Sequence, residues 1–494
     1  MNFTPELQQH PIFSVIAEAA KVTGYETYVV GGWVRDLLLK RENKKDIDFV
    51  CVGSGIELAS VAASLLPGEI HVHVYKTFGT AQFNYQGCDY EFVGARKESY
   101  NHNSRKPVVE DGTLDDDQKR RDFTINALAI SLNKETYGNL IDPFGGIADL
   151  KRKMIKTPLE PNLTFSDDPL RMMRAIRFAS QLEFDIHPDT WEGITQNLHR
   201  FEILSKERVI TEFNKILLSK KPSYGFKLLY HSGLLAKFFP EFIELLGAAN
   251  MEGKTHKDNF YHTLEVLDNV SQVSDDLWLR WAAVLHDIAK PATKRFDSKV
   301  GWTFHGHEER GARMVKKLFT RFKLPLNEKM RKVERLVRMH LRPIALVNDG
   351  VTESAIRRVM FEAGEDLEDL MLLCRADVTT KNPNKAAKYL RNFDLVEIKM
   401  REVEAADSLR NFQPVISGLH IMRVFGLTAG PEVGHIKDAV RNGILDGEVL
   451  NEFEPAYEYM LKVAAAINRH PLANFDKAEK FLAAYPTENE AEEK

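Results

Sequence analysis

V-V-G-G-W-V-R-D-L-L-L-K-R-E-N-K-K-D-I-D, residues Val29 to Asp48, sets the architecture of the N-terminal part of the chain. An apolar run ends in a glycine pair, a helical segment follows, and a Lys-rich turn leads into a second apolar run that starts at Asp46. The pattern predicts a strand, a glycine turn, a helix start and a second strand. Glycine lets a backbone approach a phosphate closely, and the free N–H groups of a helix start favour anions. Gly31 and Gly32 are therefore predicted to lie against a triphosphate.

Two carboxylates share one face of the second predicted strand. Asp46 and Asp48 are two residues apart, and side chains alternate between the faces of a strand. Hard carboxylate oxygens are the ligands that Mg²⁺ prefers, so the pair predicts a magnesium site beside the triphosphate. Glu91 lies in the later apolar run Y-E-F-V, where a third metal ligand and an edge or solvent-facing residue are equally consistent with its position.

Composition limits the class of protein. A length of 494 residues predicts several domains, and 44% hydrophobic with 28% charged residues is typical of a soluble protein. The net charge of −4 excludes a wholly basic nucleic-acid coat, so any RNA contact must use local basic surfaces. The scattered Cys51, Cys88 and Cys374 predict reduced thiols in the cytoplasm. No signal-like start or bilayer-length apolar run is present, and the acidic stretch 487–494 is expected to be disordered.

A second charged motif follows a long stretch without periodicity. Residues 94–118 are predicted to form a loop, and they lead into R-R-D-F-T-I-N, which begins at Arg120. Two arginines beside Asp122 at the start of an apolar helix suit recognition of a triphosphate or a sugar. A solvated charged helix start is the alternative.

Asp168 and Arg171 lie three residues apart in F-S-D-D-P-L-R, at the start of another predicted helix. Pro169 fits the first helical position, so a role as N-cap would by itself explain Asp168. A carboxylate acceptor beside a guanidinium donor also matches cytosine and adenine, which each offer an amino group next to a ring-nitrogen acceptor. Uracil and guanine present the reverse arrangement, so the pair would select C and A without a template. Arg174 continues along this helix toward phosphate or solvent.

Histidines and aspartates recur through the helical region after residue 254. A lone histidine on an apolar helix is more often a core residue than a ligand, but here several histidines occur in successive predicted helices. A set of histidines and aspartates without thiols suits Mn, Fe, Co, Ni or Mg and argues against structural zinc. The number of candidate ligands would also allow a second metal. A bound metal would lower the pKa of water for attack on phosphorus. The candidate ligands are His262, His286, Asp287, His307, His340 and Asp377.

Together these motifs resemble bacterial class II CCA-adding enzymes, tRNA nucleotidyltransferases of the group shared with bacterial poly(A) polymerases, fused to an HD phosphohydrolase domain. The resemblance covers nearly the whole chain. Asp167 stands where the nucleotide-selecting motif of the family usually has Glu. The residues that match family motifs are Gly31, Gly32, Arg35, Asp36, Asp46, Asp48, Arg120, Arg121, Asp122, Asn126, Asp168 and Arg171 in the transferase part, and His262, His286, Asp287 and Asp377 in the HD part.

The resemblance implies an α+β fold in four parts. These are a nucleotidyltransferase head with a small mixed sheet at 1–150, a helical neck at 151–250, an HD domain at 251–392 and a helical tail at 393–494. Within the tail, 416–446 resembles the part of the family that embraces the tRNA elbow, although plain helix capping also explains its glycines.

The implied function is two-metal, Mg²⁺-dependent addition of CCA to tRNA from CTP and ATP, with an HD domain that hydrolyses phosphate esters by means of Mg²⁺ or a transition metal. A degenerate HD domain serving as a spacer stays open. Two rival functions also stay open. One is a poly(A) polymerase acting on general RNA, which the acidic tail disfavours. The other is an HD-type nucleotide phosphohydrolase whose head only binds.

Overall fold

The computed structural model describes residues 1–41, 46–76, 79–99, 108–247, 250–251, 254–255, 258–346, 352–380, 382–407 and 414–472. The Lys-rich turn at 42–45 and the acidic stretch at 487–494 lie outside these residues. The chain divides into two compact units, each described by itself. The first comprises Met1–Ala249, His256–Arg280 and Leu318–Pro325, and the second comprises Asn250–Thr255, Trp281–Lys317 and Leu326–Lys494.

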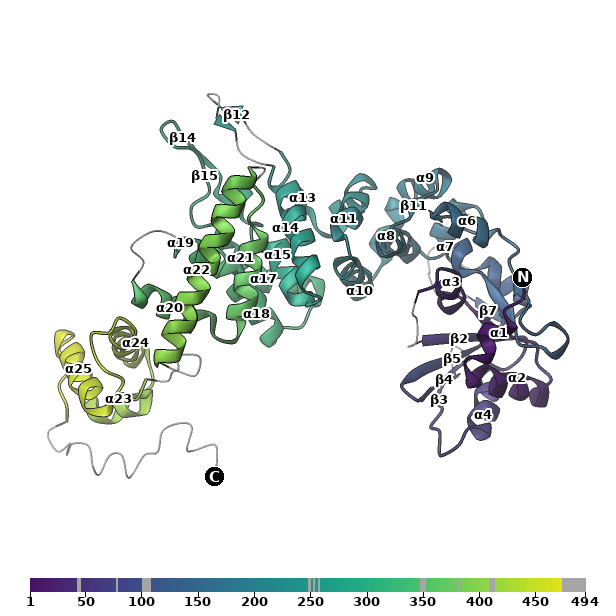
Figure 1. Cartoon of the computed structure of the whole chain (residues 1–494), viewed down its shortest axis with the longest axis horizontal. Helices are drawn as coiled ribbons and strands as arrows, with labels where there is room; N and C mark the ends of the chain where they lie inside the picture. Colours follow the sequence, from purple (N-terminus) through teal and green to yellow (C-terminus); the bar gives the residue numbers. More distant parts are fainter. Residues whose placement is uncertain are drawn as a thin grey trace. The chain divides into compact units, whose positions relative to one another are not determined.

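The head of the first unit is a seven-stranded mixed sheet (Figure 1). In spatial order its strands are β3 (His73–Tyr75), β4 (Thr80–Tyr85), β5 (Cys88–Gly94), β2 (Asp46–Cys51), β1 (Thr27–Val30), β8 (Ala129–Ser131) and β9 (Leu140–Ile141). The strands β2 and β5 run parallel, and the other neighbouring pairs run antiparallel. The prediction of a mixed-sheet head followed by a largely helical chain is confirmed.

One face of this sheet is apolar. Helices α2 (Pro11–Thr23) and α4 (Gly55–Leu65) pack over it, and Phe49, Phe83 and Phe92 are fully buried beneath them. The rings of Phe49 and Phe92 stack with centroids 5.1 Å apart across the parallel pair. Because side chains alternate along a strand, the residues next to these phenylalanines point to the opposite, polar face.

The predicted loop at 94–118 is wrong in part. Its described residues form a hairpin of β6 (Arg96–Ser99) and β7 (Val108–Asp111), followed by α5 (Leu114–Lys119). The hairpin pairs charged positions such as Arg96 with Asp111, so its strands lack the apolar alternation that would have predicted them.

The rest of the first unit is mostly helical, with one short parallel pair of strands, β10 (Met154–Ile155) and β11 (Asp185–Ile186). Its helices include α7 (Pro161–Asp167), α8 (Leu170–Leu182), α10 (Lys206–Leu217), α11 (Pro222–His231) and α14 (Asn259–Val273), and α8 packs against α10 and α11. The predicted N-cap of α8 is one residue too early. Asp168 is the C-cap of α7, and Pro169, with a helical φ of −60°, occupies the N-cap position.

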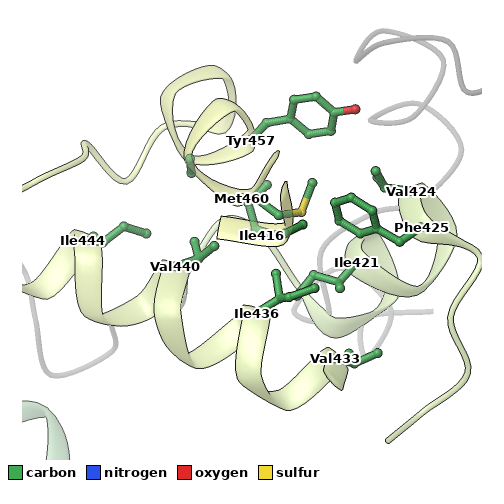
Figure 2. Close-up of a cluster of buried hydrophobic side chains, with 12 residues drawn as sticks. Ile416, Ile421, Val424, Phe425, Val433, Ile436, Val440, Ile444, Tyr457 and Met460 are labelled. Atoms are coloured by element: carbon green, nitrogen blue, oxygen red, sulfur yellow. The ribbon is translucent and has the colours of Figure 1, made fainter. Parts of the chain in front are cut away.

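The described part of the second unit is mostly helical. It includes α18 (Glu328–Met339), α20 (Glu353–Ala363), α21 (Leu367–Ala376) and α22 (Pro383–Asp407). The C-terminal helices α23 (Gly418–Phe425), α24 (Pro431–Leu445) and α25 (Phe453–Ala466) close around a core that contains Ile421, Ile436 and Met460 (Figure 2). Within the part of the chain that the structure describes, no helix is both long and apolar enough to cross a membrane.

Candidate active site

Gly31 joins β1 to α3 (Gly32–Leu38) at a point where a side chain would not fit. Its φ is +73° and its ψ −130°. A Cβ there would lie 3.2 Å from Arg121 Nη1 and 3.5 Å from Asp48 Oδ2. Glycine therefore has two roles at this position. It adopts a backbone conformation that L-residues avoid, and its lack of a side chain leaves room for the Asp48 carboxylate beside the Arg121 guanidinium.

Three carboxylates meet on the polar face of the sheet. Parallel pairing of β2 and β5 places Asp48 opposite Glu91, and Asp46 lies two residues before Asp48 on the same face. Glu91 does not lie on an edge strand, because β5 lies between β4 and β2, but its side chain is exposed, so the solvent-facing alternative stays open.

Electrostatics in this cluster favour a cation. Burial raises the pKa of Asp48, and Asp46 raises it further, against the opposing effect of Arg121. Burial and then the charge of Asp48 likewise raise the pKa of Glu91. Acids that disfavour one another's ionisation are stabilised by a divalent ion among them, so these residues fit Mg²⁺.

Arg120 and Arg121 are held by a buried partner, Asp117 on α5. Arg121 Nε donates to Asp117 Oδ2 at 2.9 Å, and Arg120 pairs with the other oxygen of the same carboxylate. Burial opposes ionisation of Asp117, but the two arginines outweigh burial and lower its pKa. Both guanidiniums are thereby fixed at the polar face of the sheet.

A chain of hydrogen bonds links α3 to α8. Arg35 makes a bidentate pair with Asp36, at 2.9 and 3.0 Å, and its Nη1 donates to Asn126 Oδ1 at 2.9 Å. Asn126 Nδ2 in turn donates to Asp122 Oδ1 at 3.0 Å, and Arg174 Nε donates to Asp122 Oδ2 at 2.7 Å. Burial opposes ionisation of Asp122, but Arg174 and Asn126 lower its pKa to about 2.

Asp168 and Arg171 both face the same cavity, although different anchors hold them. Asp168 Oδ1 accepts a hydrogen bond from Leu170 N at 3.2 Å, which preserves a capping role at the start of α8. Arg171 donates to the backbone carbonyls of Thr164 and Arg120.

The residues predicted for the head and neck line one cavity of about 770 Å³, except Asp36, which does not line it and instead pairs with Arg35. This volume suits a nucleoside triphosphate, because small-molecule sites typically measure roughly 300–1,000 Å³. The predicted residues brought together are Gly31, Gly32, Arg35, Asp46, Asp48, Glu91, Arg120, Arg121, Asp122, Asn126, Asp168, Arg171 and Arg174.

The helix α10 adds lining residues that sequence reasoning missed. Arg208, Thr211 and Lys215 lie on one face of α10, and Glu212 on that face pairs with the buried Arg177. Their spacing of three to four residues, opposite the apolar positions of the helix, was an available signal. The motifs that identified the other residues have no counterpart here, so the sequence predicts only a helical neck for this segment.

A second cluster of ionisable groups lies in the second unit. His307 Nε2 and His340 Nε2 lie 3.3 and 3.8 Å from Asp287 Oδ1, and His286 Nε2 lies 3.2 Å from Asp287 Oδ2. Asp377 Oδ1 is 3.8 Å from His286 Nε2. Except for Asp377, these side chains are buried. One ligand atom from each of Asp287, His307 and His340 can be chosen so that all three lie within 4.8 Å of one another.

The orientation of these rings fits metal ligation. His286, His307 and His340 each donate from Nδ1 to a carbonyl three residues earlier, at 2.7 Å, so each presents Nε2 toward Asp287. Burial lowers the pKa of His340 to about 4, which keeps it neutral. Lys290 Nζ, which sequence reasoning missed, lies 2.5 Å from Asp287 Oδ2. The predicted ligand His262 lies on α14, which belongs to the first unit.

Three family models match the chain. They are the Poly A polymerase head domain at 27–156, the probable RNA and SrmB-binding site of polymerase A at 183–246, and the HD domain at 259–382. The first match spans the mixed sheet, the glycine turn and the carboxylates, so the head defines a nucleotidyltransferase. Nucleotidyltransferase and HD proteins are metal-dependent.

Relatives identify the family. A Deinococcus radiodurans A-adding tRNA nucleotidyltransferase is 34% identical over 349 residues, which cover 68% of this chain and 76% of the relative. A Geobacillus CCA-adding enzyme is 30% identical over 455 residues, with 90% and 95% covered. The chain belongs to the tRNA nucleotidyltransferase and poly(A) polymerase family, and it carries an HD domain.

Solved structures share the fold. A tRNA nucleotidyltransferase complexed with a primer tRNA and an incoming ATP analog is 26% identical, with a TM-score of 0.56 over 79% of this chain and 99% of that one. A CCA-adding enzyme in an apo form is 22% identical, with a TM-score of 0.61 and coverage of 94% and 97%. These similarities agree with the mixed-sheet head and helical remainder described above.

Proposed function

We propose that the head cavity adds C, C and A to the 3′ end of tRNA from CTP and ATP without a nucleic-acid template. The observation that carries this proposal is the convergence of the carboxylates, the glycine turn and the Asp168–Arg171 pair on one cavity. Relatives described as CCA-adding enzymes, such as the Geobacillus protein, and the complex with primer tRNA support the same assignment.

The proposed mechanism uses the carboxylates as metal ligands. Asp46, Asp48 and Glu91 would hold Mg²⁺, which when bound favours deprotonation of the attacking 3′-hydroxyl and neutralises the departing pyrophosphate. The backbone at Gly31 allows close approach of the triphosphate. Arg121, fixed by the buried Asp117, supplies positive charge on the same face.

Base selection is assigned to Asp168 and Arg171. The carboxylate accepts from the exocyclic amino group of C or A, and the guanidinium donates to the adjacent ring nitrogen. The chain from Arg35 through Asn126 and Asp122 to Arg174 would keep α8, which carries Arg171, in register with the triphosphate end of the cavity.

The test uses tRNA that ends before the CCA sequence, supplied with CTP alone. The proposal predicts addition of two cytidines and then a stop, followed by a single A when ATP is added. A ladder of A residues from ATP alone would instead support the poly(A) polymerase alternative. If the protein extended no RNA but hydrolysed small phosphate esters, the result would instead support the phosphohydrolase alternative.

A-only addition is a second candidate, which two relatives favour. The Deinococcus protein and an Aquifex aeolicus relative are both A-adding tRNA nucleotidyltransferases, and the Aquifex match is 44% identical over 192 residues, which cover 38% of this chain and 23% of that relative. The same assay separates the candidates, because an A-adding enzyme would leave the shortest tRNA unchanged with CTP and extend only a tRNA that ends in CC.

A second activity is proposed for the cluster around Asp287. Three imidazoles with Nδ1 tied to carbonyls would hold Mg²⁺ or a transition metal together with Asp287. Such an ion supplies an activated water when bound, so hydrolysis of phosphate esters is the reaction class that fits.

A further inference from the structure

The neck helix α10 brings a cation to the base-selecting end of the cavity. Arg208 lies in the first turn of α10 and lines the cavity together with Asp168 and Arg171. Its Nη2 is 3.8 Å from Asp168 Oδ2. The Arg208 side chain is 41% exposed, so its charge reaches the cavity from the solvent side and is not needed in the core of the neck.

Arg208 completes the restraint on the Asp168 carboxylate. Leu170 N donates to Oδ1, and Arg208 attracts Oδ2 from a different helix. The hydrogen bond at Oδ1 and the ion pair at 3.8 Å from Oδ2 together favour one orientation of the carboxylate, whereas the Leu170 contact alone leaves Oδ2 without this directional attraction.

Arg171 takes its orientation from elsewhere. Its guanidinium donates to the carbonyls of Thr164 and Arg120, which belong to α7 and to the motif that follows α5. Separate contacts therefore orient the Asp168 carboxylate, which accepts from the base, and the Arg171 guanidinium, which donates to it. A change at Arg208 should therefore disturb the carboxylate and leave the guanidinium in place.

We propose that Arg208 is a specificity-determining positioning residue, which aims the Asp168 carboxylate at the nucleobase and so sets discrimination of C and A against U and G. This inference rests on the proposed base-selecting role of Asp168. Cytosine presents an amino donor where uracil presents a carbonyl acceptor. A fixed carboxylate repels that carbonyl, whereas a carboxylate free to rotate away tolerates it.

The test compares kcat/KM for CTP and UTP on tRNA that ends before CCA, and for ATP and GTP on tRNA that ends in CC. For Arg208→Gln we expect both ratios to fall by about threefold, the size expected when an ion pair between partly exposed side chains is lost. Arg208→Lys keeps the cation and should restore most of the discrimination. Lys206→Gln is the matched control, because it removes one charge from α10 at an exposed residue that does not line the cavity, and it should leave both ratios unchanged.

Each other outcome counts against the proposal. Unchanged ratios in Arg208→Gln, with wild-type enzyme that adds C and A normally, would overturn the role of Arg208 alone. An equal loss of kcat/KM for all four nucleotides would also overturn it and would indicate contact with the triphosphate or the RNA. Absence of C and A addition by the wild-type enzyme would overturn the proposed function and this inference with it.

Discussion

Gly31 and Gly24 share a φ of +73° but have different surroundings. A Cβ at Gly24 would have no atom within 4 Å, whereas one at Gly31 would approach both Arg121 and Asp48. Gly24 is in the αL region with ψ of 13°, whereas Gly31 has ψ of −130°, so Gly24 shows the role of a positive φ without a steric contact and Gly31 combines a conformational with a steric role.

Substitution by alanine should separate these roles. Gly24→Ala should lower the free energy of unfolding by about 1 kcal/mol, the cost of a left-handed L-residue, with nucleotide addition unchanged. Gly31→Ala should lower stability at least as much and also reduce kcat/KM at least about tenfold, because the Arg121 guanidinium must shift. Urea unfolding and tRNA extension measure the two effects. Equal activity in both variants would contradict the steric role.

Asp122 should make acid stability depend on its ion pair with Arg174. A carboxyl whose pKa is lowered to about 2 contributes stability above its unfolded value, and this contribution is lost as pH falls from about 4 to about 2. The pH-dependent part is about 2 kcal/mol at neutral pH. The difference in unfolding free energy between the wild type and Asp122→Asn should therefore shrink below pH 4 in urea titrations. A constant difference at every pH would refute the assignment.

At this scale, residue type and spacing predicted the residues that line the cavity better than the buried residues that support them. Asp46, Asp48, Asp168 and Arg171 could be found because their spacing matches a task. Asp117 could not, because it is the last of three consecutive aspartates and only burial against the arginines distinguishes it from its neighbours.

At the scale of elements, the register of β2 and β5 assembles the carboxylates. Each strand was predictable from its apolar alternation. The pairing of Asp48 with Glu91 was not, because β3 and β4 intervene in the chain, and parallel neighbours are set by tertiary packing. The lining face of α10 was missed for a related reason, since only its packing against α8 reveals that it faces a cavity.

The register that brings Asp48 beside Glu91 predicts that the Asp48 carboxylate destabilises the fold when no metal is bound. The pKa of Asp48 is raised, so its ionised form at neutral pH opposes folding, and this penalty grows as pH rises from the unfolded value toward the folded one. Asp48→Asn should raise the melting temperature without metal by about 2 °C and abolish the stabilisation by MgCl₂. Asp89→Asn, on the neighbouring strand outside the cavity, is the control and should keep the Mg²⁺ effect. A lower melting temperature for Asp48→Asn would contradict the prediction.

At the scale of the whole molecule, the two units carry separate clusters of ionisable groups. The order of the head, the RNA-binding segment and the HD domain along the chain was predictable, because each has its own motif, and the family models at 27–156, 183–246 and 259–382 agree with that order. The bounds of the four parts proposed from sequence stay predictions.

Separate sites predict separable activities. Asp287→Asn should reduce hydrolysis of 2′,3′-cyclic AMP or p-nitrophenyl phosphate by at least about a hundredfold, because the carboxylate shared by the three histidines is lost. Addition of A to tRNA ending in CC should continue at the wild-type rate. The assay should be run with Mg²⁺, Mn²⁺ and Ni²⁺, with circular dichroism to verify folding. Coupled loss of both activities in a folded variant would contradict independence.

The central claim is that Asp46, Asp48 and Glu91 carry nucleotide transfer to tRNA. Its most direct test is single-turnover addition of labelled ATP to tRNA that ends in CC, by the wild type and Asp48→Asn, with tRNA affinity measured in parallel. We predict one A per wild-type turnover, and for Asp48→Asn unchanged affinity with a rate lower by about a thousandfold, or about 4 kcal/mol. Transfer by Asp48→Asn at a rate close to that of the wild type would contradict the claim.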